Sequence, residues 1–550
     1  MDRARTVTSG PQRRWLTAVM VGIPLLFFGY FFLYPLLAIL ATSLTLDGSL
    51  ELGVFGEVAA NRTFQSIAWF TLWQAIASTI LTLIVGLPAA YVIARFDFPG
   101  KAWVRAGVTI PFVLPTVVVA AAFLALLGPT GPLGVDLRGT IWAILFAHVF
   151  FNVAVVIRTV GSMWERLDPR LEEAAMTLGA GRLRAFRDVT LPLLAPAIAS
   201  AASIVFLFTF TSFGVILILG DLRHATLEVE IWRQTTAFLD LPVAAVLSIL
   251  QLLAVSAMLL LYSRYQQRSA IELNLRSTSD TARRPRSRRQ WTFVAATLTG
   301  LGLLLATPLV VLVTRSLRTD GRFSVDAYRD LGDEASSALF VAPIEAILNS
   351  LEFAAAATFI ALLIGMMAAI VIAYRSGPAT RAFDAVLMLP LGTSAVTIGF
   401  GFLVALDAPV DLRTSAMLVP IAHALIAIPF VVRTTVPVMR SVRHRLRESA
   451  AVLGASPSAA WREVDLPIVA RAAFVGAGFA FAVSLGEFGA TSFIARPDSP
   501  TLPIAIFRLL GQPGSVTFAR AMALATILMV LTAAVVAGID RLRIGDLGDF

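Results

Sequence analysis

The sequence predicts an all-α polytopic membrane protein, in which twelve transmembrane helices form two parallel six-helix repeats. The chain of 550 residues is 57% hydrophobic and only 14% charged, whereas soluble domains carry roughly 25% charged residues. Its apolar residues also fall in blocks of about twenty, which is the length that crosses ~30 Å of hydrocarbon as a helix. Finally, the same sequence motifs return 275 residues later, after half of the chain.

The apolar blocks predict twelve spans. They lie at 16–41, 66–94, 106–127, 140–160, 192–219, 243–263, 291–314, 346–374, 384–406, 415–437, 472–494 and 517–539. The first block is too long for the core of a signal peptide and precedes no small-residue cleavage pattern, so we expect a retained helix. An even number of spans places both termini on one side. With that side in the cytoplasm of a bacterial cell, most of the 44 basic residues lie inside, as the positive-inside rule expects.

The net charge of +9 therefore reflects membrane topology, and no nucleic-acid partner is expected. Residues 1–263 form the first predicted half and residues 291–550 the second. Residues 264–290 between them are rich in arginine and poor in apolar side chains, which predicts a flexible basic cytoplasmic linker. Its basic run could bind acidic lipid head groups, although a solvated topology determinant is the favoured interpretation.

The repeat extends beyond single motifs. "AHVFFNVAVVIRTV" resembles "AHALIAIPFVVRTT", which pairs His148 with His423 and Arg158 with Arg433. Further upstream, "IPFVLPTVV" and "LPLGTSAVT" align with an offset of 279, so four residues were lost or gained between the two regions. The halves run in the same direction because an even number of helices separates them. Such parallel repeats, related by an axis along the membrane normal, are common in transporters with a central pathway.

Two polar loops, at residues 165–192 and 440–467, lie on the predicted cytoplasmic side. In the first, Asp168-Pro169 is typical of a helix start, and Gly179 can adopt the left-handed conformation that ends a helix. A second short helix would follow before Leu191-Pro192 turns the chain into the next span. The predicted helix–turn–helix presents small alanines and an apolar ridge that suits a groove on another protein. The alternative is a re-entrant hairpin that packs only under its own bundle.

These loops resemble the EAA loop of ABC importer permeases, which docks onto the ATP-binding subunits. The first match comprises Glu173, Ala174, Ala175, Gly179, Val189, Leu191 and Pro192, and the second Glu448, Ser449, Ala450, Gly454, Val464, Leu466 and Pro467. Ser449 departs from the motif, but it replaces one small residue with another. Phe186 and its counterpart Trp461 complete the coupling residues expected from the two ridges.

The resemblance implies a fused pair of type I importer domains. It further implies two ATP-binding cassette subunits as partners, an extracytoplasmic binding protein that delivers the substrate, and ATP–Mg bound only on the partners. Within the family, "LFAHVFFNVAVVIR", "FLFTFTSFGVILILG" and "SLGEFGATSFI" look most like thiamine and iron(III) permeases. We expect thiamine as the substrate, with iron(III) as the alternative.

Other functional classes fit the sequence less well. The only lysine, Lys101, lies in "ARFDFPGKA", which lacks the first glycine and the hydroxyl of a phosphate-binding loop. The chain has no cysteine, its four histidines lack metal-ligand spacing, and no GxSxG elbow occurs, so we expect neither a metal site nor an enzyme. A secondary transporter would share the parallel repeats, but it would usually need more intramembrane ionisable residues.

One intramembrane acid, Glu487, predicts a pathway site. A charge inside a span costs at least ~2.5 kcal/mol unless it is paired or hydrated. Its repeat position holds Ser212, whereas a Phe-Gly pair follows in both halves, and these residues form the candidate pathway set: Ser212, Phe213, Gly214, Glu487, Phe488 and Gly489. The alternative is that Glu487 caps a helix break near Gly486 or Gly489, or pairs with Arg496.

Overall fold

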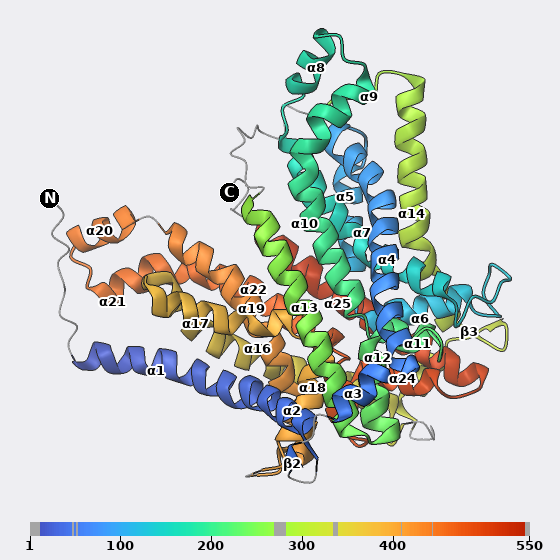
Figure 1. Ribbon diagram of the computed structural model, residues 1–550. Helices are drawn as coiled ribbons and strands as arrows, with labels where there is room; N and C mark the ends of the chain where they lie inside the picture. The colour runs from blue at the N-terminus through green and yellow to red at the C-terminus, as the bar shows by residue number, and fades with distance from the viewer. Residues whose placement is uncertain are drawn as a thin grey trace. The chain divides into compact units, whose positions relative to one another are not determined.

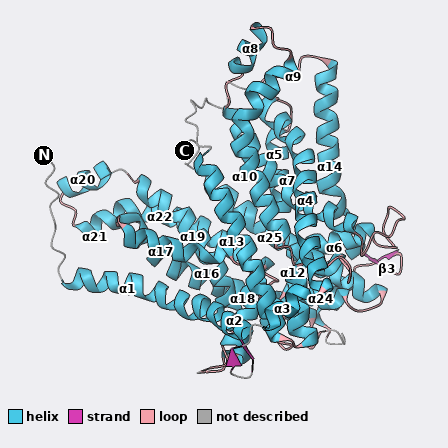
Figure 2. Ribbon diagram, in the orientation of Figure 1, coloured by secondary structure: helices cyan, strands magenta, loops and turns pink. Residues whose placement is uncertain are grey.

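The computed structural model describes residues 11–46, 49–50, 53–268, 282–333, 339–408, 410–442 and 444–544. Helices dominate the described chain, and its strands form only two short hairpins (Figures 1 and 2). Within these described ranges, ten helices are long and apolar enough to cross a membrane, and two bent helix pairs raise the possible number of spans to twelve. The predicted all-α architecture is therefore confirmed.

The helices and strands group into two compact units. Unit 1 is formed by residues 1–42, 334–504 and 530–550, and unit 2 by residues 43–333 and 505–529. The elements of unit 1 are α1 (Pro11–Phe28), η1 (Gly29–Leu33), α2 (Tyr34–Leu44), α16 (Pro343–Tyr374), α17 (Pro378–Met388), η6 (Leu389–Gly392), α18 (Ala395–Ala405), η7 (Leu412–Thr414), α19 (Leu418–Ser441), α20 (His444–Val452), α21 (Pro457–Ala460), η8 (Trp461–Asp465), α22 (Leu466–Gly486) and α23 (Thr491–Ile494).

Unit 2 contains the remaining elements and the last two residues of α2, and α24 (Leu502–Leu510) and α25 (Ser515–Ile544) are also divided between the units. They are β1 (Thr45–Leu46), β2 (Ser49–Leu50), α3 (Gly53–Ala60), α4 (Arg62–Arg95), α5 (Lys101–Val113), α6 (Thr116–Leu127), α7 (Ile141–Arg166), α8 (Arg170–Thr177), α9 (Arg182–Ala185), η2 (Phe186–Thr190), α10 (Leu191–Phe210), α11 (Gly214–Leu219), α12 (Leu227–Arg233), η3 (Gln234–Phe238), α13 (Leu241–Arg268), α14 (Arg288–Ser316), β3 (Arg318–Thr319), β4 (Arg322–Phe323), α15 (Asp326–Arg329) and η5 (Asp330–Gly332).

The first helix of each sequence half packs in the unit formed mainly by the other half. In unit 1, Phe28 and Phe32 of α1 and η1 are buried in a core with α16, α18 and α19. In unit 2, Val294 of α14 is buried against Val92 and Phe96. The boundary between the predicted halves at residues 264–290 is thus a boundary of the sequence repeat, not of the compact units.

Close helix packing repeats with the sequence. A Cβ atom at Gly86 of α4 would lie 2.7 Å from the Cβ atom of Val156 in α7, and one at Gly365 of α16 would lie 2.9 Å from that of Val431 in α19. The two glycines are 279 residues apart and the two valines 275. Both pairs therefore occupy equivalent repeat positions, and the four-residue difference falls between them, as the aligned motifs predict.

Two predicted spans are bent rather than straight. Residues 106–127 fall on α5 and α6, which meet at 101°, and residues 384–406 fall on α17–η6 and α18, which meet at 99°. In the first pair Leu114 is extended before Pro115, because a proline disfavours a helical conformation in the preceding residue. In the second pair, the Ser394 hydroxyl accepts a hydrogen bond from the Val396 N–H at 3.0 Å and starts a new helix.

The predicted linker lies partly outside the described residues, which omit 269–281. Its described end is ordered rather than flexible. Arg283 donates its N–H to the Arg95 carbonyl, and its own carbonyl accepts from the Asp97 N–H, both at 3.0 Å. Ser287 and Gln290 then form a capping box at the start of α14.

Candidate functional site

Both EAA-like loops contain the predicted glycine-terminated helix. The Asp168 side chain accepts a hydrogen bond from the Arg170 N–H at 3.0 Å at the start of α8. Gly179 then adopts φ +93°, and its counterpart Gly454 adopts φ +86°. The N–H of the following alanine donates to the carbonyl of Ala175 in the first loop, at 3.1 Å, and to that of Ala450 in the second, at 2.9 Å. Each helix therefore ends in a left-handed glycine cap, in which the motif alanine supplies the backbone acceptor.

An exposed apolar ridge follows each glycine-capped helix. Leu178 is 90% exposed and its repeat mate Leu453 87% exposed, while Leu183 at the start of α9 is 82% exposed. Exposed leucines that gather on one loop are typical of a protein–protein contact. The sequence predicts that Phe186 belongs to the first ridge. Its ring instead stacks on buried Trp164, with the two ring centroids 6.1 Å apart. Its counterpart Trp461 is 40% exposed.

The Leu-Pro pairs do not turn the chain into the next span, so this prediction is wrong. α9, η2 and α10 form one continuous helix from Arg182 to Phe210, and the second loop enters a similar helix from Ser458 to Gly486. The Leu191 N–H bonds to the Phe186 carbonyl and the Leu466 N–H to that of Trp461, each in a wide π-turn. A proline lacks an N–H donor and normally clashes with the carbonyl of the previous turn. The π-turn changes the hydrogen-bond pattern of the turn before each proline, so Pro192 and Pro467 fit inside their helices. Both prolines lie on exposed faces.

The other coupling residues lie on the same surface elements. Glu173 and Ala174 are exposed on α8, Glu448 is exposed on α20, and Leu191 and Leu466 are each 38% exposed at the start of their long helices. The structure thus gathers the predicted residues of each loop around its ridge.

A polar triad that sequence reasoning missed ties the second loop to its bundle. Both oxygens of the Asp465 carboxylate accept from the Arg447 Nε at 3.0 Å. The Arg447 Nη2 also donates to the Tyr374 hydroxyl at 3.1 Å, and that hydroxyl donates to Asp465 at 3.3 Å. Asp465 is 1% exposed, and its hydrogen bond to the Arg447 side chain raises the pKa of that guanidinium above its ordinary value.

The repeat positions in the first loop carry different groups, and only Arg447 faces a residue of opposite charge in the alignment. Arg447 corresponds to Glu172, Asp465 to Thr190 and, with the offset of 279, Tyr374 to Arg95. The Thr190 hydroxyl donates to the Glu172 carboxylate at 3.2 Å. Arg95 instead donates from Nη1 to the Leu167 carbonyl at 3.0 Å. Both loops are therefore anchored at equivalent points by different chemistry.

The helix after each loop breaks inside the apolar region, where the candidate pathway residues lie. In the second repeat, α22 ends at Gly486 and α23 begins at Thr491. Glu487 is only 7% exposed, and its carboxylate accepts from the Ala490 N–H at 2.8 Å and the Thr491 N–H at 2.9 Å. It therefore caps α23, as the capping alternative predicts. Arg496 pairs with Asp498 instead, and a role of Glu487 beside the pathway stays a prediction.

A buried histidine stabilises each break. The His148 ring bonds to the hydroxyls of Ser78 and Ser212, both at 2.9 Å. In the second repeat the Nδ1 of His423 contacts the Ser484 hydroxyl at 2.7 Å, and its Nε2 lies 3.2 Å from the Glu487 carboxylate. The paired histidines thus form buried hydrogen bonds at equivalent positions of the two repeats. Within the described ranges, no group of three or more histidines and acids could hold a metal ion.

The Phe-Gly pairs lie within these breaks. Phe213 is 7% exposed and Phe488 2%. A Cβ atom at Gly489 would lie 2.9 Å from the Cβ atom of Ala395, so close packing with α18 requires this glycine. Gly214 starts α11 immediately after the first break.

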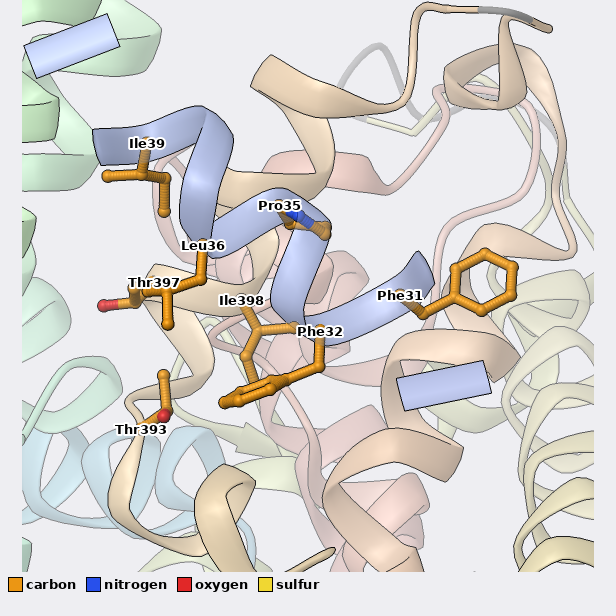
Figure 3. Close-up of a pocket in the computed structure, with 8 residues that line it drawn as sticks. All are labelled: Phe31, Phe32, Pro35, Leu36, Ile39, Thr393, Thr397 and Ile398. Atoms are coloured by element: carbon orange, nitrogen blue, oxygen red, sulfur yellow. The ribbon is translucent and has the colours of Figure 1, made fainter. Parts of the chain in front are cut away.

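Unit 1 also contains a shallow apolar pocket, in which none of the predicted site residues takes part (Figure 3). Its lining residues are Phe31, Phe32, Pro35, Leu36, Ile39, Thr393, Thr397 and Ile398. A Cβ atom at Gly401 would lie 3.0 Å from that of Pro35, so α2 and α18 approach closely beside the pocket. The pocket is thus a packing feature of these two helices.

Both loops and both broken helices lie inside segments that match one protein family. The description "binding-protein-dependent transport system inner membrane component" matches residues 83–269 and 361–542. The chain belongs to this family. The resemblance inferred from the duplicated loops is thereby confirmed, and the protein is a multi-pass inner-membrane permease, the transport subunit of an ABC importer.

Two relatives match the permease along most of its length, and a third matches less than half of it. The probable ABC transporter permease protein y4fN of Sinorhizobium fredii is 26% identical over 557 residues, which cover 96% of each chain. The thiamine transport system permease protein ThiP of Brucella abortus is 28% identical over 526 residues, covering 92% of the permease and 93% of that protein. The sulfate transport system permease protein CysT of Salmonella typhimurium is 32% identical over 253 residues, covering 44% of the permease and 89% of CysT.

A solved bacterial ABC transporter involved in the import of alginate matches 47% of the permease and 96% of its own chain. Its TM-score is 0.41 at 17% identity.

Proposed function

We propose that the permease forms the pathway of an ATP-driven importer of thiamine compounds. The observation that carries the transport role is the pair of exposed ridges, each joined to a continuous helix that reaches a break in the apolar region. The relatives named ThiP, which match both halves in one alignment, support the thiamine assignment. The sequence resemblance to iron(III) permeases keeps iron as the second substrate to test.

The proposed mechanism begins at the two loops. Each ridge docks into a groove of one ATP-binding cassette subunit, and ATP–Mg is bound and hydrolysed on these partners. An extracytoplasmic binding protein delivers the substrate at the opposite face. The termini and both loops then lie in the cytoplasm, in agreement with the distribution of basic residues. Because both loops belong to one chain, a single copy of the permease suffices per complex.

Uptake by proteoliposomes tests the proposal. The permease, its ATPase and its binding protein are reconstituted, and uptake of radiolabelled thiamine, thiamine monophosphate, thiamine diphosphate and iron(III) is measured with ATP or ADP inside. We expect ATP-dependent accumulation of a thiamine compound and none of iron(III). Uptake driven by an ion gradient without ATP would assign the protein to secondary transport instead.

The binding protein gives a second measurement. A ligand that binds only the folded state must raise its melting temperature. We expect thiamine compounds to do so and iron(III) to have no effect, and stabilisation by iron(III) alone would overturn the thiamine assignment. Native mass spectrometry of the complex checks the stoichiometry, for which we expect one permease chain and two ATPase subunits.

A further inference from the structure

Two equivalent residues of the repeat meet in unit 2. The rings of Trp232 in α12 and Phe507 in α24 lie 6.0 Å apart at an interplanar angle of 86°, and these residues are 275 positions apart. Segments of the two repeats therefore contact each other within unit 2. In transporters built from parallel repeats, substrate sites lie where the repeats meet.

The sequence-predicted pathway leads to the same place. Phe213, the aromatic residue of the first helix break, contacts Trp232 with ring centroids 6.4 Å apart. A chain of aromatic rings therefore extends from the break in α10–α11 to the meeting point of α12 and α24.

An arginine follows each of the two meeting residues, but only one of them has an acidic partner. Arg233 follows Trp232, and its Nη1 lies 3.5 Å from the Glu230 carboxylate. Glu230 also accepts from Gln234 at 2.7 Å. Arg508 follows Phe507, but the positions equivalent to Glu230 and Gln234 hold Ala505 and Leu509. The second repeat has thus kept the cation and lost the groups that neutralise it.

Two hydrogen-bond donors remain unsatisfied at this place. The Nη1 of Arg508 and the indole Nε1 of Trp232 are both buried without a hydrogen-bond partner. Among the described residues Arg508 forms no ion pair. A buried donor without an acceptor is costly. Both N–H groups therefore lack a hydrogen-bond acceptor.

We propose that Arg508 and the Trp232 N–H bind an oxyanion group of the transported solute. A phosphate, sulfate or carboxylate supplies the acceptor that both donors lack, and a guanidinium suits such groups especially well. The rings of Trp232 and Phe507 would contact the apolar part of an organic solute. This site rests on the proposed transport function and refines its substrate class, because it favours phosphorylated thiamine over free thiamine, whose positive charge Arg508 would repel.

Transport by the reconstituted complex tests the site. Uptake of thiamine, thiamine monophosphate, thiamine diphosphate and sulfate is compared for the wild type, Arg508→Gln and Arg508→Lys. We expect Arg508→Gln to reduce uptake of the oxyanion-bearing solute at least about tenfold, since a hydrogen bond to a charged group contributes about one factor of ten or more in binding. Arg508→Lys keeps the charge and should retain part of the uptake. Trp232→Phe removes the N–H but keeps an aromatic ring and the Arg508 charge, so it should cause a smaller loss.

Arg233→Gln is the matched control at the equivalent position. Because Glu230 already neutralises Arg233, this substitution should leave the ratio of phosphorylated to free thiamine uptake unchanged. Equal uptake of every solute by the wild type and Arg508→Gln would overturn the site, as would a wild type that carries only free thiamine.

A binding measurement separates this site from the thiamine proposal. The melting temperature of the purified full-length permease is measured with inorganic phosphate, sulfate or thiamine diphosphate. We expect an oxyanion to raise it for the wild type but not for Arg508→Gln. If this difference holds while no thiamine compound is transported, the oxyanion site stands and the thiamine assignment falls. If thiamine is transported but neither protein responds to any oxyanion, the site is wrong and the transport function stands.

Discussion

The two EAA-like loops have the same backbone design but opposite anchoring charges. Both end their first helix at a left-handed glycine and expose a leucine beside it. The first loop carries an acid, Glu172, which binds a hydroxyl, whereas the second carries Arg447, which binds a buried acid. The comparison teaches that the repeat preserves where a loop is held, while the interaction that holds it can be replaced.

The largest expected difference between the loops follows from this replacement. Arg447→Ala would leave the buried Asp465 with only Tyr374 as a partner, and breaking a buried ion pair costs about 3–5 kcal/mol. Thr190→Ala removes a single hydrogen bond in the first loop, which contributes about 1 kcal/mol. Hydrogen exchange should therefore show a far greater loss of protection in residues 440–467 for Arg447→Ala than in residues 165–192 for Thr190→Ala. Equal losses would contradict the distinction, and Arg447→Lys serves as the charge-preserving control.

Crowding the close helix contacts should lower the stability of the permease by similar amounts in the two repeats. Gly86→Ala and Gly365→Ala each place a methyl group under 3.0 Å from a valine, and such overpacking costs about 1–3 kcal/mol. Thermal unfolding of the purified permease should detect both losses. Val156→Gly and Val431→Gly remove the crowding Cβ and Cγ atoms, so each, combined with the respective glycine variant, should lose less stability than the sum of the two single losses. Additive losses in one repeat alone would show that the two contacts are not equivalent.

The cap glycines test the shared backbone design. A Cβ atom at Gly179 or Gly454 meets no atom within 4 Å, so the expected effect comes from the left-handed backbone and not from crowding inside the chain. Replacement by valine should cost about 1–2 kcal/mol and abolish coupling of ATP hydrolysis to transport. Asparagine tolerates this conformation, so Gly179→Asn and Gly454→Asn should remain coupled. Full coupled transport by the double valine variant would refute the role of the turn.

The broken helices give the smallest expected difference. Glu487→Gln keeps one side-chain acceptor for the cap of α23 and should destabilise the permease by about 1 kcal/mol. Ser212→Ala, its counterpart in the first repeat, should have a similar effect through the loss of the bond to His148. If Glu487 acts as a cap, the concentration dependence of thiamine uptake should stay unchanged in Glu487→Gln. A selective rise of KM for cationic solutes, without loss of stability, would place the carboxylate beside the pathway.

Local backbone signals in the sequence predicted much of the loop geometry. Asp168, Gly179 and Gly454 have chemistries that fix a helix start or end without help from distant residues, and they adopt the expected conformations. Hydropathy predicted the helical spans, but it measures only length and polarity. It therefore could not reveal the bends after Leu114 and near Ser394, or the packing of α14 against α4 and α6.

The sequence did not predict the residues that anchor the two loops, for a different reason. A repeat is recognised by similar letters, and the pair Glu172–Thr190 shares none with Arg447–Asp465. The common spacing of 18 residues between a polar loop residue and a polar residue before Leu-Pro was the available signal. Likewise, Arg508 resembles Arg233 in sequence, and only the packed structure shows that Arg233 pairs with Glu230 while the Nη1 of Arg508 has no partner.

The uninterrupted helix from Arg182 to Phe210 has a mechanical consequence. Its 29 residues make a rod roughly 40 Å long, at about 1.5 Å per residue. One end carries the exposed Leu183 and the other ends beside Ser212 and its bond to His148. If the helix moves as one rigid body, a tilt of about 5° at the loop displaces the far end by about 3.5 Å. That displacement exceeds the 2.9 Å length of the Ser212–His148 hydrogen bond, so we expect a small tilt of the loop to break this bond.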